Sequence, residues 1–199
     1  MKYRWLFLIA LLLPLIFLNN TATVAAPIPD EVNFQTYVYE EGNPPDELVH
    51  FLNLEGATNS DYTIHGTMWQ PQFWSHVNRG VYGNGTVMSH KDAAGGYEWA
   101  HISVPFPTYI NGVAENIAFV QFCAEADHPS RTKPTKLQIW ADTLIYNGTI
   151  SWPNSTARQC VGVTFAPIWK ESLGLSVLIK YYNGTDKVTL DKAWVRIVP

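Results

Sequence analysis

The stretch LGLSVLIKYYNGTDKVTLDKAWVRIV, residues 173–198, decides the fold class of this chain. From Leu173 to Tyr181 an apolar side chain occurs at every second position, and the residues between are mostly small or polar. This alternation has the two-residue period of a strand with one face buried. The sequence therefore predicts β-structure with an inner and an outer face.

The second part of the same stretch changes its parity. The apolar residues Val188 and Leu190 occupy even-numbered positions, whereas the apolar residues Ala193 and Val195 that follow occupy odd-numbered positions. One extra residue in a strand would rotate its side chains in this way. We therefore expect a β-bulge near Asp191-Lys192.

Two Asn-Gly pairs predict hairpins, because type I′ turns need two positive-φ residues between twisted strands. Asn147-Gly148 would join residues 137–146 to residues 149–152, and Asn183-Gly184 would join residues 173–182 to residues 187–198.

The rest of the chain consists of short runs of β-branched and aromatic residues separated by Gly, Pro and Asn. A first strand is expected at residues 32–39. Residues 117–124 are apolar on both parities except for Gln121, so they predict a central strand covered on both sides. No stretch after residue 26 keeps a helical apolar period for three turns, and the nearest, residues 45–54, is short. The prediction is an all-β protein, an antiparallel two-sheet sandwich of jelly-roll type, with little or no helix.

The N-terminus has the pattern of a secretory signal peptide. Lys2 and Arg4 precede an apolar run, and Thr23-Val24-Ala25 offers the small residues of a cleavage site. We interpret residues 1–25 as the signal peptide and residues 26–199 as a single β-sandwich domain. The mature protein is then expected to be secreted into the extracellular space, without a membrane anchor.

Composition narrows the classes of partner. The 199 residues include 13 Lys and Arg against 17 Asp and Glu, a formal net charge of −4. Without a basic surplus, no nucleic acid partner is expected. The chain also lacks a Walker-type phosphate loop and a G-x-S-x-G elbow, which argues against nucleotide and serine hydrolase chemistry.

Cys123 and Cys160 are the only cysteines of the chain. Export leads to an oxidising compartment in most cells, so we expect one disulfide between them. The alternative of a nucleophilic or metal-binding cysteine has no supporting neighbourhood.

An ordered series of motifs from residue 65 onward resembles an uncharacterised family of small secreted β-sandwich proteins. The series comprises His65-Gly66, Trp99-Ala100-His101-Ile102 followed by Pro105-Phe106-Pro107-Thr108, residues 137–142, and Leu173-Gly174-Leu175-Ser176. The chain departs from the family pattern at Phe106 and Thr143. The resemblance implies the fold but no reaction, cofactor or ligand. The last strand, around Asp191-Lys192-Ala193-Trp194-Val195, is also similar to the closing strand of jelly-roll carbohydrate-binding modules.

Four histidines lie between residues 65 and 101, but they lack the close pairs typical of metal sites. Glu98 and His101 stand three apart on an expected strand and so point to opposite faces. We interpret His101 as a hydrogen-bonded sheet residue, and no cofactor is expected. A calcium ion around Asp61 or Asp186 remains an alternative that spacing does not reveal.

Glu125 and Asp127 are the best-placed pair of carboxyl groups for glycoside hydrolysis, which needs two of them across a cleft. They also fit a solvated strand end, so no catalytic residue is assigned.

The segment from Thr67 to Trp74 is rich in aromatic and glutamine residues. Exposed rings stack on sugar faces and amides orient hydroxyl groups, so this composition suits a glycan site. The candidate ligand-binding residues are Trp69, Gln70, Gln72, Trp74 and Tyr82, with glycans or cell-surface polymers as partners. The alternative is that Trp69 and Trp74 fill the core, as expected for Trp140, Trp169 and Trp194.

Asn84, Asn147, Asn154 and Asn183 begin N-x-S/T sequons and are candidate glycosylation sites in a eukaryotic secretory pathway. Chance is the alternative, because turns themselves favour Asn-Gly.

The leading functional hypothesis is a non-catalytic extracellular module that binds glycans. A self-associating structural surface or matrix protein is the alternative, and a weak hydrolase or metal enzyme is a third. The sequence leaves the oligomeric state open.

Overall fold

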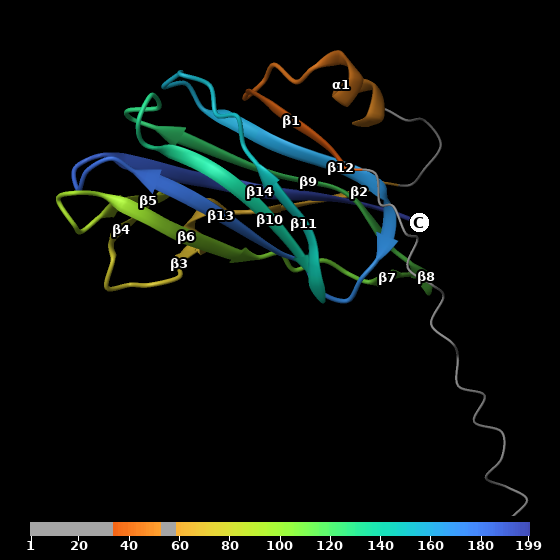
Figure 1. The fold of residues 1–199 in the computed structure, drawn as a ribbon. Helices are drawn as coiled ribbons and strands as arrows, with labels where there is room; N and C mark the ends of the chain where they lie inside the picture. Colours follow the sequence, from red (N-terminus) through yellow and green to blue (C-terminus); the bar gives the residue numbers. More distant parts are fainter. Residues whose placement is uncertain (1–33, 53–58) are drawn as a thin grey trace, which may run out of the picture. The chain divides into compact units, whose positions relative to one another are not determined.

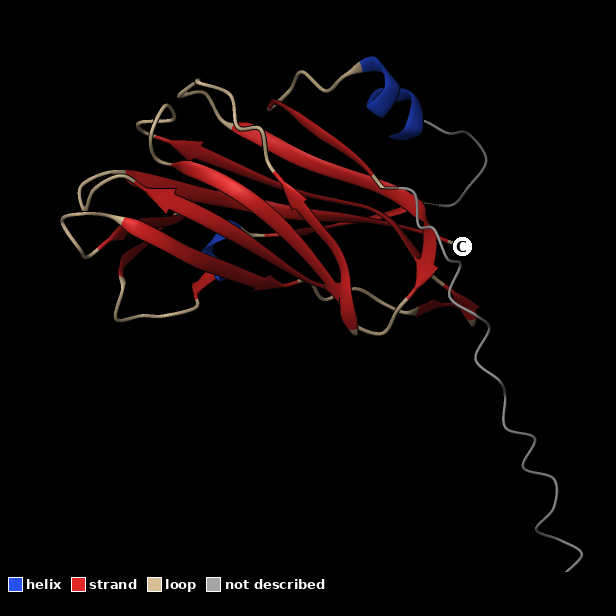
Figure 2. Cartoon of the chain, in the orientation of Figure 1, coloured by secondary structure: helices blue, strands red, loops and turns tan. Residues whose placement is uncertain are grey.

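The alternation found at residues 173–181 recurs in most strands and assembles two antiparallel sheets packed face to face (Figure 1). The structure is a computed structural model that describes residues 34–52 and 59–199. The expected signal peptide, residues 1–25, lies outside the described residues. No helix among the described residues is long and apolar enough to cross a membrane. Strands dominate the described chain (Figure 2), which confirms the prediction of an all-β sandwich of jelly-roll type.

Within the described ranges, the larger sheet has seven strands. Their order is β1 (Gln35–Glu40), β12 (Gln159–Trp169), β9 (Asn116–Ala126), β14 (Lys187–Val198), β5 (Gly85–His90) and β4 (Val77–Tyr82), with β2 (Ser60–Ile64) also paired to β14.

The second sheet, over the same ranges, has five strands. Their order is β11 (Thr143–Thr149), β10 (Lys133–Ala141), β13 (Gly174–Tyr181), β6 (Gly96–Ser103) and β3 (Gln70–Pro71). A separate small hairpin pairs β7 (Tyr109–Ile110) with β8 (Val113–Ala114).

The main core lies between the two sheets and consists of the inward apolar residues of both. Removing this apolar surface from water is the dominant favourable term in folding. Strand β9 is buried along nearly its whole length, as predicted for residues 117–124. Its inward residues join the main core, while Phe119 on the other side packs with Tyr37 and Leu48. Leu48 belongs to α1 (Asp46–Leu52), the short helix that lies beside β1 (Figure 1).

Strand β14 contains the predicted bulge. Its register against β9 shifts between Leu190 and Ala193. Asp191 and Lys192 both lie in this shift, so Leu190 and Ala193 can both point into the core.

The hairpin predicted at Asn183-Gly184 is wrong. Strands β13 and β14 lie in different sheets, so the connection between them crosses the sandwich instead of turning back within one sheet. Neither Asn183 nor Gly184 has a positive φ. The Asn183 side chain instead accepts hydrogen bonds from the backbone N–H groups of Thr185 and Asp186.

The hairpin predicted at Asn147-Gly148 is also wrong in its position. The chain turns earlier, at Asp142, which has a φ of 63° and whose carboxylate accepts a hydrogen bond from Ser172. Asn147 and Gly148 lie inside β11, opposite Gln138 and Leu137. A Cβ on Gly148 would stand 1.9 Å from the Tyr146 hydroxyl, so this glycine serves a close approach and not a turn.

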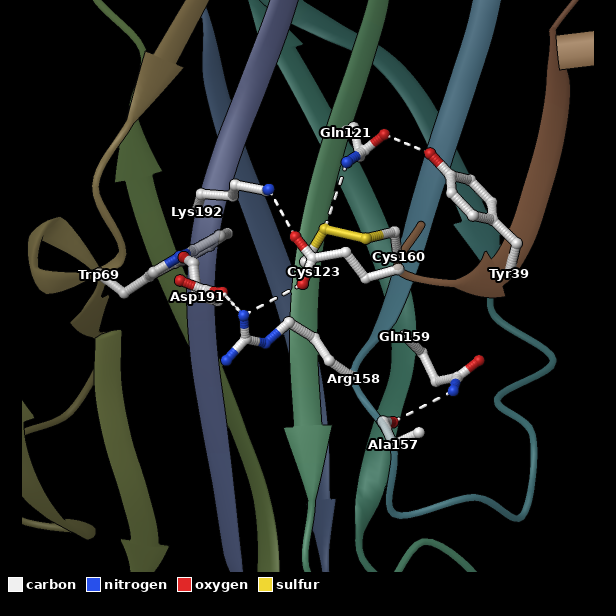
Figure 3. Close-up of a disulfide and its surroundings, with 11 residues drawn as sticks. Tyr39, Trp69, Gln121, Cys123, Ala157, Arg158, Gln159, Cys160, Asp191 and Lys192 are labelled. Carbon is white, nitrogen blue, oxygen red and sulfur yellow. Dashed lines mark hydrogen bonds and ion pairs between the residues drawn. A yellow bond between two sulfur atoms is a disulfide. The ribbon is translucent and has the colours of Figure 1, made fainter. Parts of the chain in front are cut away.

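The expected disulfide joins Cys123 and Cys160, which are register partners on the neighbouring strands β9 and β12. Figure 3 shows it on the outer side of the seven-stranded sheet, beside Tyr39 and Gln121, whose side chains are hydrogen-bonded to each other. Burial, followed by the negative charge of Glu41, raises the pKa of Tyr39 to about 12.

Charged side chains next to the disulfide form a connected network (Figure 3). The Arg158 guanidinium lies 3.0 Å from Glu41 and 2.8 Å from Asp191, and Lys192 pairs with Glu41. We call the outer side of the seven-stranded sheet, with α1, the disulfide and this network, the covered face.

Candidate functional site

The outward side chains of the five-stranded sheet form the second outer surface of the sandwich, which we call the open face. Inward residues such as Ala100, Leu137 and Val177 are buried in the core. Successive side chains of a strand point to opposite sides of a sheet, and the outward residues here are mostly polar, aromatic or basic. The strand alternation therefore places a chemically varied surface over a rigid support.

A row of polar side chains crosses the open face from one sheet edge to the other. Gln70 of β3 is paired with His101 of β6, His101 with Ser176 of β13, Ser176 with Gln138 of β10, and Gln138 with Asn147 of β11. Directly opposed side chains on one face of an antiparallel pair stand about 5 Å apart. The row thus offers donors and acceptors at the spacing of neighbouring strands.

His101 has a defined environment in the middle of this row. Its Nδ1 lies 2.7 Å from the Ser176 hydroxyl oxygen, and its ring stacks on Trp99 with the centroids 6.5 Å apart. Burial lowers the pKa of His101, an effect that the charge of Glu98 partly opposes. His101 is therefore a hydrogen-bonded sheet residue, as expected. Glu98 points to the opposite, inner side of β6, so the two do not share a metal.

Next to His101 the open face has a hollow of about 360 Å³. The side chains that line it include Met68, Gln70, His101, Ser103, Trp140 and Ser176. Trp140 is 42% exposed and presents an indole at the rim. A hollow with an aromatic surface and a few polar groups is typical of small-ligand sites.

The structure separates the two tryptophans of the predicted binding segment. Trp69 is 0% exposed, packs edge-on against Phe122, and donates its indole N–H to the Asp191 carbonyl oxygen at 2.8 Å. No face of its ring can reach a ligand, so Trp69 is a core residue, the alternative left open by the sequence. Trp74 is 53% exposed and lies under the Arg79 guanidinium.

The remaining predicted residues occupy different surfaces. Gln70 lies on the open face, and the exposed Gln72 follows it, with its backbone N–H donating to the Trp99 carbonyl oxygen at 2.7 Å. Tyr82 is 59% exposed and borders a separate hollow of the seven-stranded sheet. The five predicted residues are thus not brought together, and Gln70 is the one that lines the hollow of the open face.

The expectation that Trp140 and Trp169 fill the core is wrong. Trp140 is 42% and Trp169 is 39% exposed, whereas Trp194 is partly buried against Phe119. A signal for Trp140 existed in the sequence. Leu137 and Ile139 share one parity of β10, and Trp140 falls on the other parity with Gln138, which is the outward one.

The hollow beside Tyr82 has a volume of about 420 Å³ and includes Glu125 and Asp127. These are the two carboxyl groups that the sequence offered for hydrolysis. Asp127 already accepts a hydrogen bond from the Lys187 backbone N–H at 2.8 Å, and Glu125 lies 4.0 Å from Arg158. Both carboxylates therefore have partners within the protein.

The two carboxylates named as calcium candidates are both bound by arginine. Arg131 donates two hydrogen bonds of 3.0 Å to Asp186, and Arg196 contacts Asp61 at 2.8 Å. Burial raises the pKa of Asp186, but hydrogen bonds from Thr132 and Arg131 outweigh it and hold this pKa below its ordinary value. Asp127 and His128 approach Asp186 closely enough to share an ion. A cation there would have to displace a guanidinium.

Three of the four sequon asparagines, Asn84, Asn147 and Asn154, are exposed. Asn183 is partly buried and its side-chain oxygen is occupied by the turn described above. Glycosylation of these positions stays a prediction.

No family model matches the sequence, and no curated protein matches it. Several solved structures show a likeness to this chain at low identity and TM-scores below 0.5. The CBM36-1 domain of a multidomain xylanase from the hindgut metagenome of Trinervitermes trinervoides is 8% identical, with a TM-score of 0.44 over 68% of this chain and 96% of that domain. A xylan-binding module, CBM15, is 9% identical, with a TM-score of 0.44 over 69% of this chain and 97% of the module. The C-terminal CBM6 of a laminarinase from Zobellia galactanivorans is 9% identical, with a TM-score of 0.40 over 70% of this chain and 100% of that module.

Proposed function

We propose that this protein is an extracellular, non-catalytic module that binds glycans on its open face. The observation that carries the proposal is the polar row from Gln70 to Asn147, which lies between two tryptophans, Trp99 and Trp140. Aromatic rings provide flat apolar surfaces, and amide, hydroxyl and imidazole groups orient a ligand that carries many hydroxyl groups.

The dimensions of the face suit an extended ligand better than a single sugar. Trp140 is paired with Gly174, and Gly174 with Ser103, which stands four residues from Trp99 on β6. With strands about 4.8 Å apart and a rise of about 3.4 Å per residue, Trp140 and Trp99 stand roughly 17 Å apart along a diagonal. A chain of several sugar rings can contact both.

Location outside the cell is supported by two features of the chain. The N-terminal residues have the pattern of a signal peptide, and the Cys123–Cys160 disulfide suits an oxidising compartment. Polymeric glycans are abundant ligands in such a setting, and a rigid sheet surface can bind them without moving.

The test compares two tryptophans of similar exposure. Trp140→Ala is expected to weaken binding to a retained glycan at least about ten-fold, as removal of a central aromatic anchor does. Trp169→Ala is the matched control, because Trp169 lies on β12 and outside the open face. The measurement is retention of residues 26–199 in gels that contain a panel of soluble polysaccharides. Equal binding by wild type and Trp140→Ala would contradict the proposal.

One observation favours the second candidate, self-association. Strand β11 lies at the edge of its sheet, and its sequence TLIYNGT contains no charged residue. Uncharged edge strands can pair with a second copy. Light scattering over a range of concentrations distinguishes the two, since self-association predicts oligomers that a Leu144→Lys substitution abolishes.

A further inference from the structure

The open face carries positive charge on a protein that is acidic as a whole. The chain has a formal net charge of −4. The strands of the five-stranded sheet contain three lysines, Lys133, Lys136 and Lys180, and a single carboxylate, Glu98. Glu98 points inward, is 3% exposed, and is bound by the Phe73 backbone N–H and by His76. No carboxylate of these strands therefore faces outward.

The lysines are close together at one end of the open face. Lys133 and Lys180 are direct partners across β10 and β13, and Lys136 is paired with Leu178, two residues from Lys180. Like charges that stand directly opposite each other on a sheet are destabilising. None of the three lysines forms an ion pair with a carboxylate among the described residues.

Aromatic side chains accompany this charge. Lys180 is paired with Tyr97 on β6, and Leu178 with Trp99. The exposed Tyr97 and the half-buried Trp99 thus lie beside the lysines on the same surface. A ligand on this end of the face meets flat rings and ammonium groups together, and a ligand with matching chemistry has both apolar ring faces and negative charges.

We propose that the glycan bound here is an acidic polysaccharide, whose carboxylate or sulfate groups pair with Lys133, Lys136 and Lys180 while its rings lie over Trp99 and Trp140. This inference rests on the proposed function. It names the class of glycan and assigns the lysines as the residues that select it. Lysine suits this role because its ammonium group is a compact charge on a flexible stem that can follow an irregularly substituted polymer.

The experiment uses three soluble polymers with the same cellulose backbone. Carboxymethyl-cellulose carries carboxylates, cellulose sulfate carries sulfates, and hydroxyethyl-cellulose is neutral. Affinity of residues 26–199 for each polymer is measured at about 50 mM and about 500 mM salt, since exposed charge pairs are largely screened at the higher value. The two acidic polymers show which anion the face prefers.

We expect at least one acidic polymer to bind about ten-fold more tightly than hydroxyethyl-cellulose at low salt, and this advantage to vanish at high salt. The double variant Lys133→Gln/Lys180→Gln should reduce affinity for that polymer about ten-fold and leave binding to the neutral polymer unchanged. Lys170→Gln is the matched control, because Lys170 follows β12 and lies outside the open face. Thermal unfolding of each variant verifies that it is folded.

The outcomes separate this inference from the proposed function. Equal, salt-independent binding of all three polymers, with loss in Trp140→Ala, would overturn the acidic ligand and retain glycan binding. Binding of acidic polymers that survives in Lys133→Gln/Lys180→Gln would overturn the role of these lysines. Failure of every polymer to bind, together with a negative glycan panel, would contradict both.

Discussion

The covered face and the open face are built from the same kind of antiparallel strand, yet they differ in how several of their basic side chains are paired. On the covered face Arg158, Lys192 and Arg196 each have a carboxylate partner. On the open face Lys133 and Lys180 face each other, and neither has a carboxylate partner within residues 34–52 and 59–199. A protein selected only for stability has no reason to keep such a pair, because it opposes folding. This contrast is what the proposed function predicts, with the open face available to a ligand.

The tryptophans of the two faces also differ in their environment. Trp194 on the covered face packs edge-on against Phe119, with the centroids 4.9 Å apart. Trp140 on the open face is instead 42% exposed. The same residue type thus contributes packing on one side and an accessible ring on the other.

The largest effect is expected from two tryptophans whose roles the sequence analysis assigned the other way round, with Trp69 as a binding candidate and Trp140 in the core. Trp69→Ala should lower the free energy of unfolding by about 3–5 kcal/mol, because it leaves a cavity and an unpaired Asp191 carbonyl group. Trp140→Ala should cost about 1 kcal/mol or less, since its indole is 42% exposed. Urea denaturation measures both. Similar losses in the two variants would abolish the distinction between supporting and binding aromatics.

Removal of the disulfide tests how much the covered face contributes to stability. Replacing Cys123 and Cys160 by Ala together removes a cross-link between residues 37 apart in sequence. The chain-entropy model gives a loss of about 4 kcal/mol for a loop of this length. Glycan affinity should be unchanged in the folded protein, because both cysteines lie on the covered face. A folded double variant that no longer binds would show that the two faces are coupled.

Substitutions of single charged residues test the comparison of the two faces further. Arg158→Gln breaks contacts to Glu41 and Asp191 and should lower the free energy of unfolding by about 1 kcal/mol. Lys133→Gln should leave stability unchanged or raise it by a few tenths of a kcal/mol, since it relieves the repulsion with Lys180. Chemical denaturation of the two variants side by side gives the sign of each change in the free energy of unfolding. Destabilisation by Lys133→Gln would mean that this lysine has a stabilising partner.

The smallest effect is expected from pH, in a separate window for each face. The folded pKa of His101 is lowered, so protonation favours the unfolded chain, and stability should decline as the pH falls through about 6.5. The hydrogen bond from Lys192, opposed by burial and reinforced by Arg158, holds the pKa of Glu41 below its ordinary value. The stability from Glu41 is therefore present above about pH 4.5 and is lost on further acidification.

Thermal unfolding of wild type, His101→Gln and Glu41→Gln across this range assigns each window. The decline near pH 6.5 should disappear only in His101→Gln, and the decline below pH 4.5 should diminish only in Glu41→Gln. A shared response of both variants would contradict the assignment.

Much of the fold could be predicted because it depends on local patterns. The alternation from Leu173 to Tyr181, the parity change at Asp191-Lys192 and the doubly buried β9 each follow from side-chain periodicity. The disulfide could be predicted from the number of cysteines, which is two, and from the expected oxidising compartment. Such features require no knowledge of which strands become neighbours.

The features that failed depend on contacts distant in sequence. The turn at Asp142 is held by a hydrogen bond from Ser172, 30 residues further along the chain. Asn183-Gly184 resembles a hairpin turn until β14 is known to pair with β9 and β5 in the other sheet. The Asn-Gly pair at this position correctly indicated that the chain changes direction. It did not indicate which sheet the following strand would join.

The candidate site was only partly predictable for the same reason. Gln70 was identified from local composition, but the row that it joins comes from four strand pairings between segments far apart in the chain. Trp140, Lys136 and Lys180 had the right parity, whereas Lys133 reaches the open face only through the register shift between Pro134 and Lys136. Parity alone also does not tell which sheet surface stays uncovered.

The position of β14 also determines when the seven-stranded sheet can form during synthesis. This strand lies between β9 and β5 and also pairs with β2, although it comes after every other strand of the described residues. The seven-stranded sheet therefore cannot close while residues 187–198 are still within the ribosome. The nascent sheet therefore stays open until β14 emerges, and the long-range pairings of this strand predict slow folding.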